Sequence, residues 1–425
     1  MSSPQAHEDI WPTADPAPQG GCPAGDGAIA LYGPRFQQNP GELYRNMRAE
    51  HGPVAPVTLE GGVPAWLVLG YREIHHVESN PELFARDTRR WNGWHLVSDD
   101  WALMPWVGYQ PSVMFAEGAE HRRRAGAIGE ALAAADEFEL RTLCERIADQ
   151  LIDEFVGAGQ VDLMSRFAHP MPLFVMAALF GFGADEAAPL MQDLTDTVAS
   201  DDGMAAHQRI VDRMRALIER KKQQPGADVP SRLLAHDAGF TDDEIVQDLL
   251  VVLTAAQQPT AYWIGNAIRL MLTDQRFAVT LSGGRRSVGQ ALNEVLWEDT
   301  PTQNFIGRFA TRDTELGGKM IRTGDMLVMG FAGANTDPQI RPDSYNDSMG
   351  NHAHMSFGHG EHSCLQPGPE IGSIISSTAI EVLLDRLPDI ALSVHPDELV
   401  WLPSVWMRGL TALPVEFTAG QPSGL

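Results

Sequence analysis

A glycine-rich turn that ends in a single thiol, FGHGEHSC at residues 357–364, limits the folds open to this chain more than any other segment. Gly358 and Gly360 allow backbone angles that residues with a Cβ resist, so the turn can bring backbone N–H groups close to the sulfur. Such N–H groups, and the start of the apolar helix expected next, would favour a thiolate over a thiol. A thiolate is a good ligand for iron, and a buried unreactive cysteine is the alternative interpretation.

The spacing Phe-Gly-x-Gly-x-His-x-Cys resembles the haem-binding loop of the cytochrome P-450 family, and the resemblance extends over about residues 28–418. It implies a mainly α fold with a small β region, triangular in outline, whose long central helix crosses the haem. It also implies that Cys364 is the proximal thiolate ligand of the iron in a b-type haem. Phe357 would pack beside the sulfur, and Gly358 would belong to the loop around the haem.

The composition sets limits on compartment and partners. With 425 residues, of which 44% are hydrophobic, the chain can bury a large core, and its length alone suggests two or three domains. The resemblance instead implies that residues 28–425 form one domain. No apolar run reaches the 18 or so residues of a membrane span, and a net charge of −25 disfavours nucleic acid. Residues 1–27 lack the features of a signal peptide and predict a flexible lead-in. Only Cys22, Cys144 and Cys364 occur, which favours a reducing compartment, the cytoplasm.

Short patterns before residue 90 predict a helix, a hairpin and a second helix. Leu43–Glu50 reads as the first helix, and Val54–Val57 and Ala65–Leu69 read as strands joined by a glycine turn. Tyr71 would open the second helix. Four tryptophans follow, and either core packing or a loop over the substrate explains them, since apolar cores and apolar sites share a composition. They are Trp91, Trp94, Trp101 and Trp106.

A capping box formed by Thr241 and Glu244 opens an apolar run that continues to Leu272, which predicts a helix about 45 Å long at 1.5 Å per residue. A helix that is apolar on most sides is expected to be central. The resemblance identifies it as the helix that crosses the distal face of the haem.

The centre of this helix departs from the family pattern Ala-Gly-x-acid-Thr. Gln258 stands in place of the acid and Pro259 in place of the threonine. An acid and a hydroxyl would deliver protons during O–O bond cleavage, but an amide cannot titrate and a proline should kink the helix. Gln258 and Thr260, the latter turned inward by the kink, are therefore the catalytic candidates that remain beside Cys364. The alternative is that the proton relay is absent.

The resemblance assigns His121, Arg308 and His354 to the haem propionates. The family tends to place an arginine four residues after the first of these, where this chain has Ala125. Arg124 is the candidate substitute, from another angle of the same helix.

The family's Glu-x-x-Arg pair reads Glu294 and Trp297 in this chain, and no arginine occurs between Asp343 and Cys364. The sequence therefore predicts that both positive partners of Glu294 are lost together, and apolar packing can replace a buried ionic cluster at little cost. We expect Trp297 to fill the vacated space and Glu294 to hydrogen-bond backbone or water.

The resemblance implies a haem-thiolate monooxygenase that inserts oxygen from O2 into a small apolar molecule of the secondary-metabolite type. Electrons would come from a ferredoxin and its reductase, and basic residues at 122–124 could dock an acidic partner. The altered helix centre leaves two alternatives open. One is a peroxide-driven enzyme, and the other is a non-catalytic haem protein that acts as a ligand sensor or partner subunit.

Overall fold

The computed structural model describes residues 27–199, 203–274, 285–341 and 351–423. The expected flexible lead-in, apart from Gly27, lies outside these residues, and Cys22 lies outside with it. Within the described stretches no helix combines the length and the apolar character that crossing a bilayer requires.

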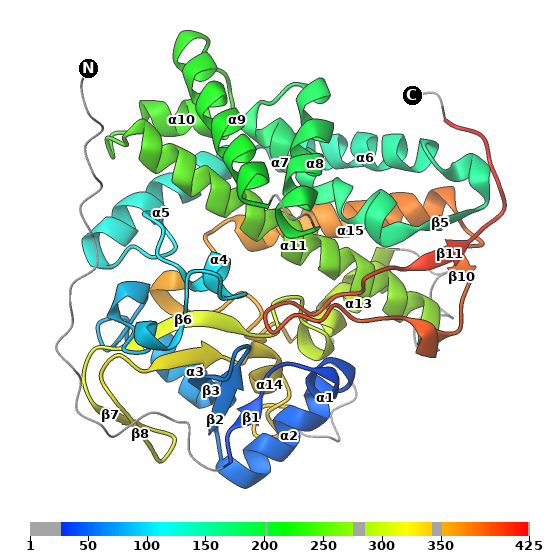
Figure 1. Cartoon of the computed structure of the whole chain (residues 1–425). Helices are drawn as coiled ribbons and strands as arrows, with labels where there is room; N and C mark the ends of the chain where they lie inside the picture. Colours follow the sequence, from blue (N-terminus) through cyan, green and yellow to red (C-terminus); the bar gives the residue numbers. More distant parts are fainter. Residues whose placement is uncertain (1–26, 200–202, 275–284, 342–350, 424–425) are drawn as a thin grey trace.

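Helices make up most of the described chain, and a small sheet region lies below them in Figure 1. This arrangement confirms the mainly α class with a small β region. The α-helices are α1 (Pro34–Gln38), α2 (Pro40–His51), α3 (Tyr71–Glu78), α4 (Met104–Val107), α5 (Gly118–Ala133), α6 (Glu137–Asp153), α7 (Pro170–Phe180), α8 (Ala184–Ala199), α9 (Gly203–Gln223), α10 (Val229–Ala235), α11 (Asp242–Thr273), α13 (Arg285–Glu298), α14 (Phe331–Asn335) and α15 (Gly368–Arg386).

Three sheets account for the strands. A six-stranded sheet has the order β1-β2-β3-β9-β6-β4, a three-stranded sheet has the order β10-β11-β5, and β7 pairs with β8. The strands are β1 (Ile29–Ala30), β2 (Val54–Leu59), β3 (Val63–Val68), β4 (Phe84–Ala85), β5 (Gln160–Asp162), β6 (Phe305–Ala310), β7 (Thr314–Leu316), β8 (Lys319–Ile321), β9 (Met326–Met329), β10 (Ala391–Leu392) and β11 (Pro414–Glu416).

The first part of the sheet follows the sequence pattern closely. The predicted hairpin is confirmed as β2 and β3, antiparallel with Val57 opposite Ala65. Gly61 and Gly62 turn the chain with φ values of +84° and +74°, which side chains with a Cβ rarely adopt. The helices on either side, α2 and α3, are also confirmed, and α2 begins three residues earlier than predicted because Pro40 occupies its first turn.

Helix α11 is the central element and spans 32 residues (Figure 1). The predicted capping box is present, since Thr241 accepts from the backbone of Glu244 and Glu244 accepts from the backbone of Thr241. The helix packs against α7, α9, α13 and α15, which explains its apolar residues on several faces. Pro259 lies inside it without ending the helix.

The tryptophan-rich segment packs largely within the protein. The ring of Trp91 lies 4.9 Å from that of Trp94 and 5.9 Å from that of Trp101, centroid to centroid. The indole N–H of Trp101 donates to the carbonyl of Glu60, at the turn between β2 and β3. Core packing therefore explains these three tryptophans, whereas Trp106 on α4 is 44% exposed.

Candidate haem-thiolate site

The Cys364 loop has the glycine geometry that its sequence predicts. Gly358 and Gly360 adopt φ values of +70° and +72°. The backbone N–H of Cys364 donates to the carbonyl of Phe357 at 2.8 Å, which closes the turn. Helix α15 begins at Gly368, where a Cβ would lie only 3.0 Å from the sulfur of Cys364, so a glycine lets the helix approach the thiol.

The loop by itself does not favour a thiolate, and that expectation is wrong. Among the described residues no backbone N–H donates to the sulfur of Cys364. The residue is exposed, but the protein packed around its sulfur raises the pKa of the thiol to about 11, and the nearby carboxylate of Glu370 adds to the shift. A metal ion that replaces the proton would hold the sulfur in the thiolate form.

The middle of α11 is more accessible to solvent than the turns on either side of it. Thr254 and Ala255 are exposed and residues 256–259 are half-buried, although the turns before and after them are buried. One turn further on, the ring of Trp263 packs edge to face against Phe357 at 5.9 Å, so this helix lies beside the Cys364 loop. A core helix with an exposed central turn is expected where a ligand cavity lies against it.

The two catalytic candidates on α11 occupy different settings. Thr260 is 7% exposed and faces α15, because a Cβ at Gly372 would lie 3.6 Å from its hydroxyl oxygen. Gln258 is half-buried and makes no hydrogen bond within the described chain. Its neighbour Gln257 donates instead to the carbonyl of His169 at 3.3 Å. The hydroxyl of Thr260 and the amide of Gln258 are thus both free of strong competing partners.

Arg308 carries donors that need an anion. Its side chain is 2% exposed, and its Nη2 lies 3.5 Å from Oε1 of Glu78, which is itself buried. Nε and Nη1 have no hydrogen-bond partner among the residues that the structure describes. The other carboxylate oxygen of Glu78 accepts from the backbone N–H of His359 at 2.6 Å, so this ion pair is anchored to the Cys364 loop. A buried guanidinium with unsatisfied donors is costly unless a ligand supplies an acceptor.

Two histidines adjoin this cation, and one was missed from the sequence. The ring of His121 on α5 lies 3.9 Å from the ring of His362, and its Nδ1 lies 3.5 Å from Oε1 of Glu361. Burial lowers the pKa of both rings, and Arg86 and Arg308 lower that of His362 further. His362 is part of the motif, two residues before the cysteine, and this position could have identified it. The motif was used only to recognise the family, and no role was assigned to His362.

The ring of His354 packs near that of Phe357, with ring centroids 5.8 Å apart. Its Nδ1 is buried without a partner, and burial lowers the pKa of the ring to about 4. A neutral imidazole can still donate one N–H to a carboxylate. The loop thus carries an accessible sulfur, is linked through Glu78 to the buried Arg308, and packs against the half-buried His354, and this set of groups fits an iron porphyrin with anionic propionates.

The structure does not support Arg124 as a haem ligand. Its guanidinium forms a bidentate ion pair with Asp248 of α11, with Nε 2.8 Å from Oδ2 and Nη2 2.6 Å from Oδ1, and Nη2 also donates to the carbonyl of Pro111. Both members of the pair are buried. This pairing joins α5 to α11 and occupies the donors that a propionate would use.

The expectation for Glu294 is wrong. Nη2 of Arg341 lies 2.7 Å from Oε1 of Glu294, and the same guanidinium lies 5.7 Å from the ring of Trp297. Arg341 lies in the loop at residues 335–347, where the family carries its second arginine, but the prediction considered only residues after Asp343 and missed it. Trp297 does fill the interior as predicted, with 1% exposure and an indole N–H that donates to the carbonyl of Asn351.

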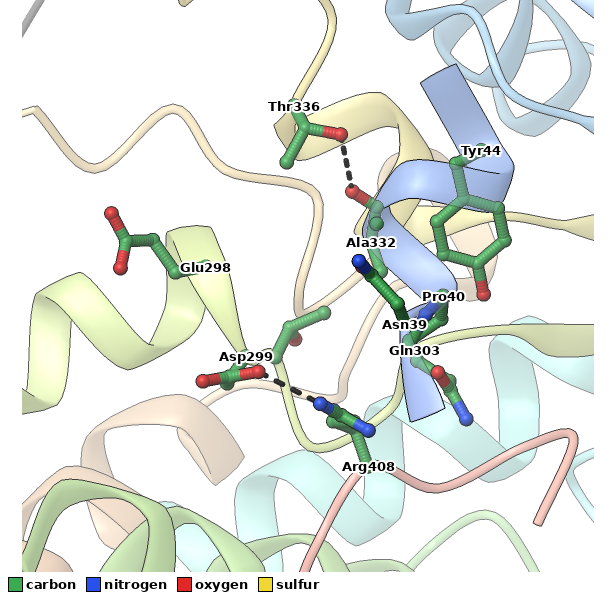
Figure 2. A pocket seen from close by; sticks show the side chains of 11 residues that line it. Asn39, Pro40, Tyr44, Glu298, Asp299, Gln303, Ala332, Thr336 and Arg408 are labelled. Carbon is green, nitrogen blue, oxygen red and sulfur yellow. Dashed lines mark hydrogen bonds and ion pairs between the residues drawn. The ribbon is translucent and has the colours of Figure 1, made fainter. Parts of the chain in front are cut away.

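A separate hollow of about 260 Å³ lies between α2, the end of α13 and α14 (Figure 2). Its polar walls include Glu298, Asp299 and Arg408, and Nε of Arg408 donates to Asp299 at 3.3 Å. No residue of the 357–364 loop lines it, so this hollow is distinct from the thiol site.

Comparisons with known proteins agree with this geometry, although no protein-family model matches the chain. It is 30% identical over 397 residues to the vitamin D(3) 25-hydroxylase of Pseudonocardia autotrophica, covering 91% of this chain and 95% of that protein. It is 28% identical over 411 residues to the cytochrome P450 monooxygenase PikC of Streptomyces venezuelae, covering 93% and 95%. Among solved structures it resembles CYP154C4 of a Streptomyces species, with a TM-score of 0.81, 26% identity and coverage of 93% and 98%.

Proposed function

The chain belongs to the cytochrome P450 family and is an enzyme of its monooxygenase class, and from this premise we propose that it oxidises a small apolar molecule of the secondary-metabolite type. The proposed cofactor is haem b, with Cys364 as the axial ligand. The observation that carries the proposal is an accessible thiol on a loop that Glu78 links to Arg308, a buried cation whose Nε and Nη1 make no hydrogen bond to the described residues. Thiolate-ligated haem supplies the activation of oxygen in this class.

The remaining residues would position this chemistry. Arg308, His354 and His121 would hold the propionates, and Phe357 would pack beside the sulfur. The open central turn of α11 would face the substrate, and its apolar and small residues suit an apolar molecule. Thr260 could hold or pass a proton through its hydroxyl.

The altered centre of α11 favours a second candidate, a peroxide-driven enzyme. The amide of Gln258 can orient a water molecule or a peroxide, but it cannot deliver protons by titrating. Peroxide brings its own protons and electrons, so a site without an acid suits it better than it suits stepwise reduction of O2.

We further propose a ferredoxin and its reductase as electron donors, docking over α5. A surface hollow there is lined by Ala125 and Gly126 of α5 and by Gln366 and Pro367, which follow the thiol loop closely in the sequence. A Cβ at Gly129 would lie 2.8 Å from the carbonyl of Gln366, so the helix touches the segment that follows Cys364. This is a short route from the surface to the sulfur.

Turnover of a substrate panel under two regimes tests these proposals. One regime supplies ferredoxin, reductase and NAD(P)H, and the other supplies hydrogen peroxide. Product only with the electron donors supports the O2-driven monooxygenase, and product only with peroxide supports the second candidate. Haem-loaded protein that forms no product under either regime would contradict both and leave the sensor or partner role.

A further inference from the structure

Arg86 is a buried cation that the haem motifs do not account for. It follows strand β4 and is 5% exposed. Its Nε donates to the carbonyl of Met114 at 3.2 Å, and its Nη1 donates to the carbonyls of Ile306 and Gly307 at 2.9 Å and 3.3 Å. Its guanidinium carbon also lies 4.8 Å from the ring centroid of Phe305. These contacts fix the plane and position of the guanidinium.

The backbone of β6 is shaped to admit this side chain. The pairing of β6 with β9 shifts register between Ile306 and Arg308, and Gly307 adopts a φ of +127° at that point. A Cβ on Gly307 would lie 2.3 Å from Nη1 of Arg86. Only a glycine can occupy this position while the guanidinium stays where it is.

The charge around Arg86 is not balanced by the protein. Arg86 and Arg308 repel each other, and Glu78 is the carboxylate that acts on both. Burial and the charge of Arg308 lower the pKa of Arg86 well below its usual range. Nη2 of Arg86 donates to no acceptor in the described chain. Two buried guanidinium groups and one carboxylate carry a net positive charge, which a further anion would balance.

We propose that Arg86 binds a haem propionate together with Arg308, in place of the arginine that is missing four residues after His121. This inference rests on the proposed haem-thiolate function. Three observations carry it: a guanidinium edge without a partner, a second cation with unpartnered donors beside it, and a strand bulge that makes room for both. Arg124, the other candidate for the missing arginine, is held by Asp248.

The rate at which haem transfers from the purified protein to an excess of apomyoglobin tests the inference. Arg86→Leu is expected to lose haem about ten to a hundred times faster than the wild type, the range expected for a charged hydrogen bond. The difference between wild type and variant should nearly vanish when both are reconstituted with haem dimethyl ester, whose propionates carry no charge. Arg89→Leu removes a mostly exposed arginine of the same segment, and this control should match the wild type with either haem.

Equal haem loss from wild type and Arg86→Leu would overturn the inference, and so would a difference that persists with the dimethyl ester, which would indicate a purely structural role. If Arg86→Leu does not fold, Arg86→Lys decides the matter. The lysine should show several-fold faster loss of haem and no faster loss of the ester, and equal loss of haem would again overturn it. Failure of the proposed function looks different, because the wild type would then bind no thiolate-ligated haem at all.

Discussion

Glu294 shows how a buried carboxylate depends on its partner. Arg341 supplies the positive charge from the loop that follows α14, with side-chain exposures of 13% for the arginine and 6% for the glutamate. Trp297 occupies the arginine position of the motif, and its ring packs near the same guanidinium. Glu294 therefore keeps an arginine partner, which comes from the loop instead of from the motif position on its own helix.

Replacing Arg341 with Met should destabilise the protein by about 3–5 kcal/mol, because it removes the cation 2.7 Å from the buried carboxylate of Glu294. Arg166, which pairs with Glu154 on the surface, is the matched control, and Arg166→Met should cost less than about 1 kcal/mol. Urea unfolding at neutral pH measures both values. Equal stability of the two variants would show that Arg341 does not stabilise Glu294.

The sequence predicted the local backbone of the glycine turn but missed a contact that crosses the fold. Gly358 and Gly360 adopt the positive φ values that the motif indicates, because these angles depend only on the local chain. The pairing of Glu294 with Arg341 joins segments 47 residues apart. Spacing rules cannot supply a partner that reaches the same place from a different point of the chain.

At the level of elements, α11 is held by polar contacts at its beginning and near its centre. Near its beginning, Asp248 is buried completely and binds both Arg124 of α5 and the backbone N–H of Val113. At its centre, Gln257 contacts His169 at the start of α7. The length and cap of α11 were predictable from the capping box and the apolar run, whereas these two partners depend on which helices pack beside it.

The Arg124–Asp248 ion pair should stabilise the packing of α5 against α11 and should not contribute to haem binding. Arg124→Leu and Asp248→Leu alone should each destabilise the protein by about 3–5 kcal/mol, and the double variant should recover most of that loss. Haem content per folded protein should stay constant in all three. A large loss of haem from a double variant of normal stability would instead assign Arg124 to the cofactor.

His169 should make stability depend on pH in the acid range. Burial lowers the pKa of its ring from 6.5 to about 4. The unfolded chain therefore binds a proton that the folded protein does not, and stability is lost as the pH falls from 6.5 toward 4, by up to about 3 kcal/mol. Comparing unfolding free energies at pH 7 and 4.5 should show a smaller loss for His169→Gln than for the wild type. The exposed His207→Gln should follow the wild type, and equal losses in all three proteins would contradict the prediction.

At the scale of the whole molecule, the sequence pattern and the structure agree on the helical class and on the small sheet region. The protein carries a net charge of −25, which should repel an acidic ferredoxin over most of its surface. Arg122, exposed on α5 beside Glu361, is one of the few local cations near the thiol loop. Local charge would then decide where an electron donor docks.

Arg122→Glu should slow ferredoxin-driven turnover several-fold at low ionic strength, with a smaller effect at high salt, because steering is screened. Peroxide-driven turnover should not change, since it needs no protein partner. Arg146→Glu, an exposed arginine on α6, is the matched control and should leave both rates unchanged. A loss of both activities in Arg122→Glu would indicate damage to the haem site rather than to docking.

The absorption spectrum of the reduced protein under carbon monoxide decides whether Cys364 ligates a haem iron. We expect the red-shifted Soret band of a haem whose axial ligand is a thiolate, and its complete loss in Cys364→Ala. Purified protein without haem, or a spectrum that is the same in wild type and Cys364→Ala, would contradict it.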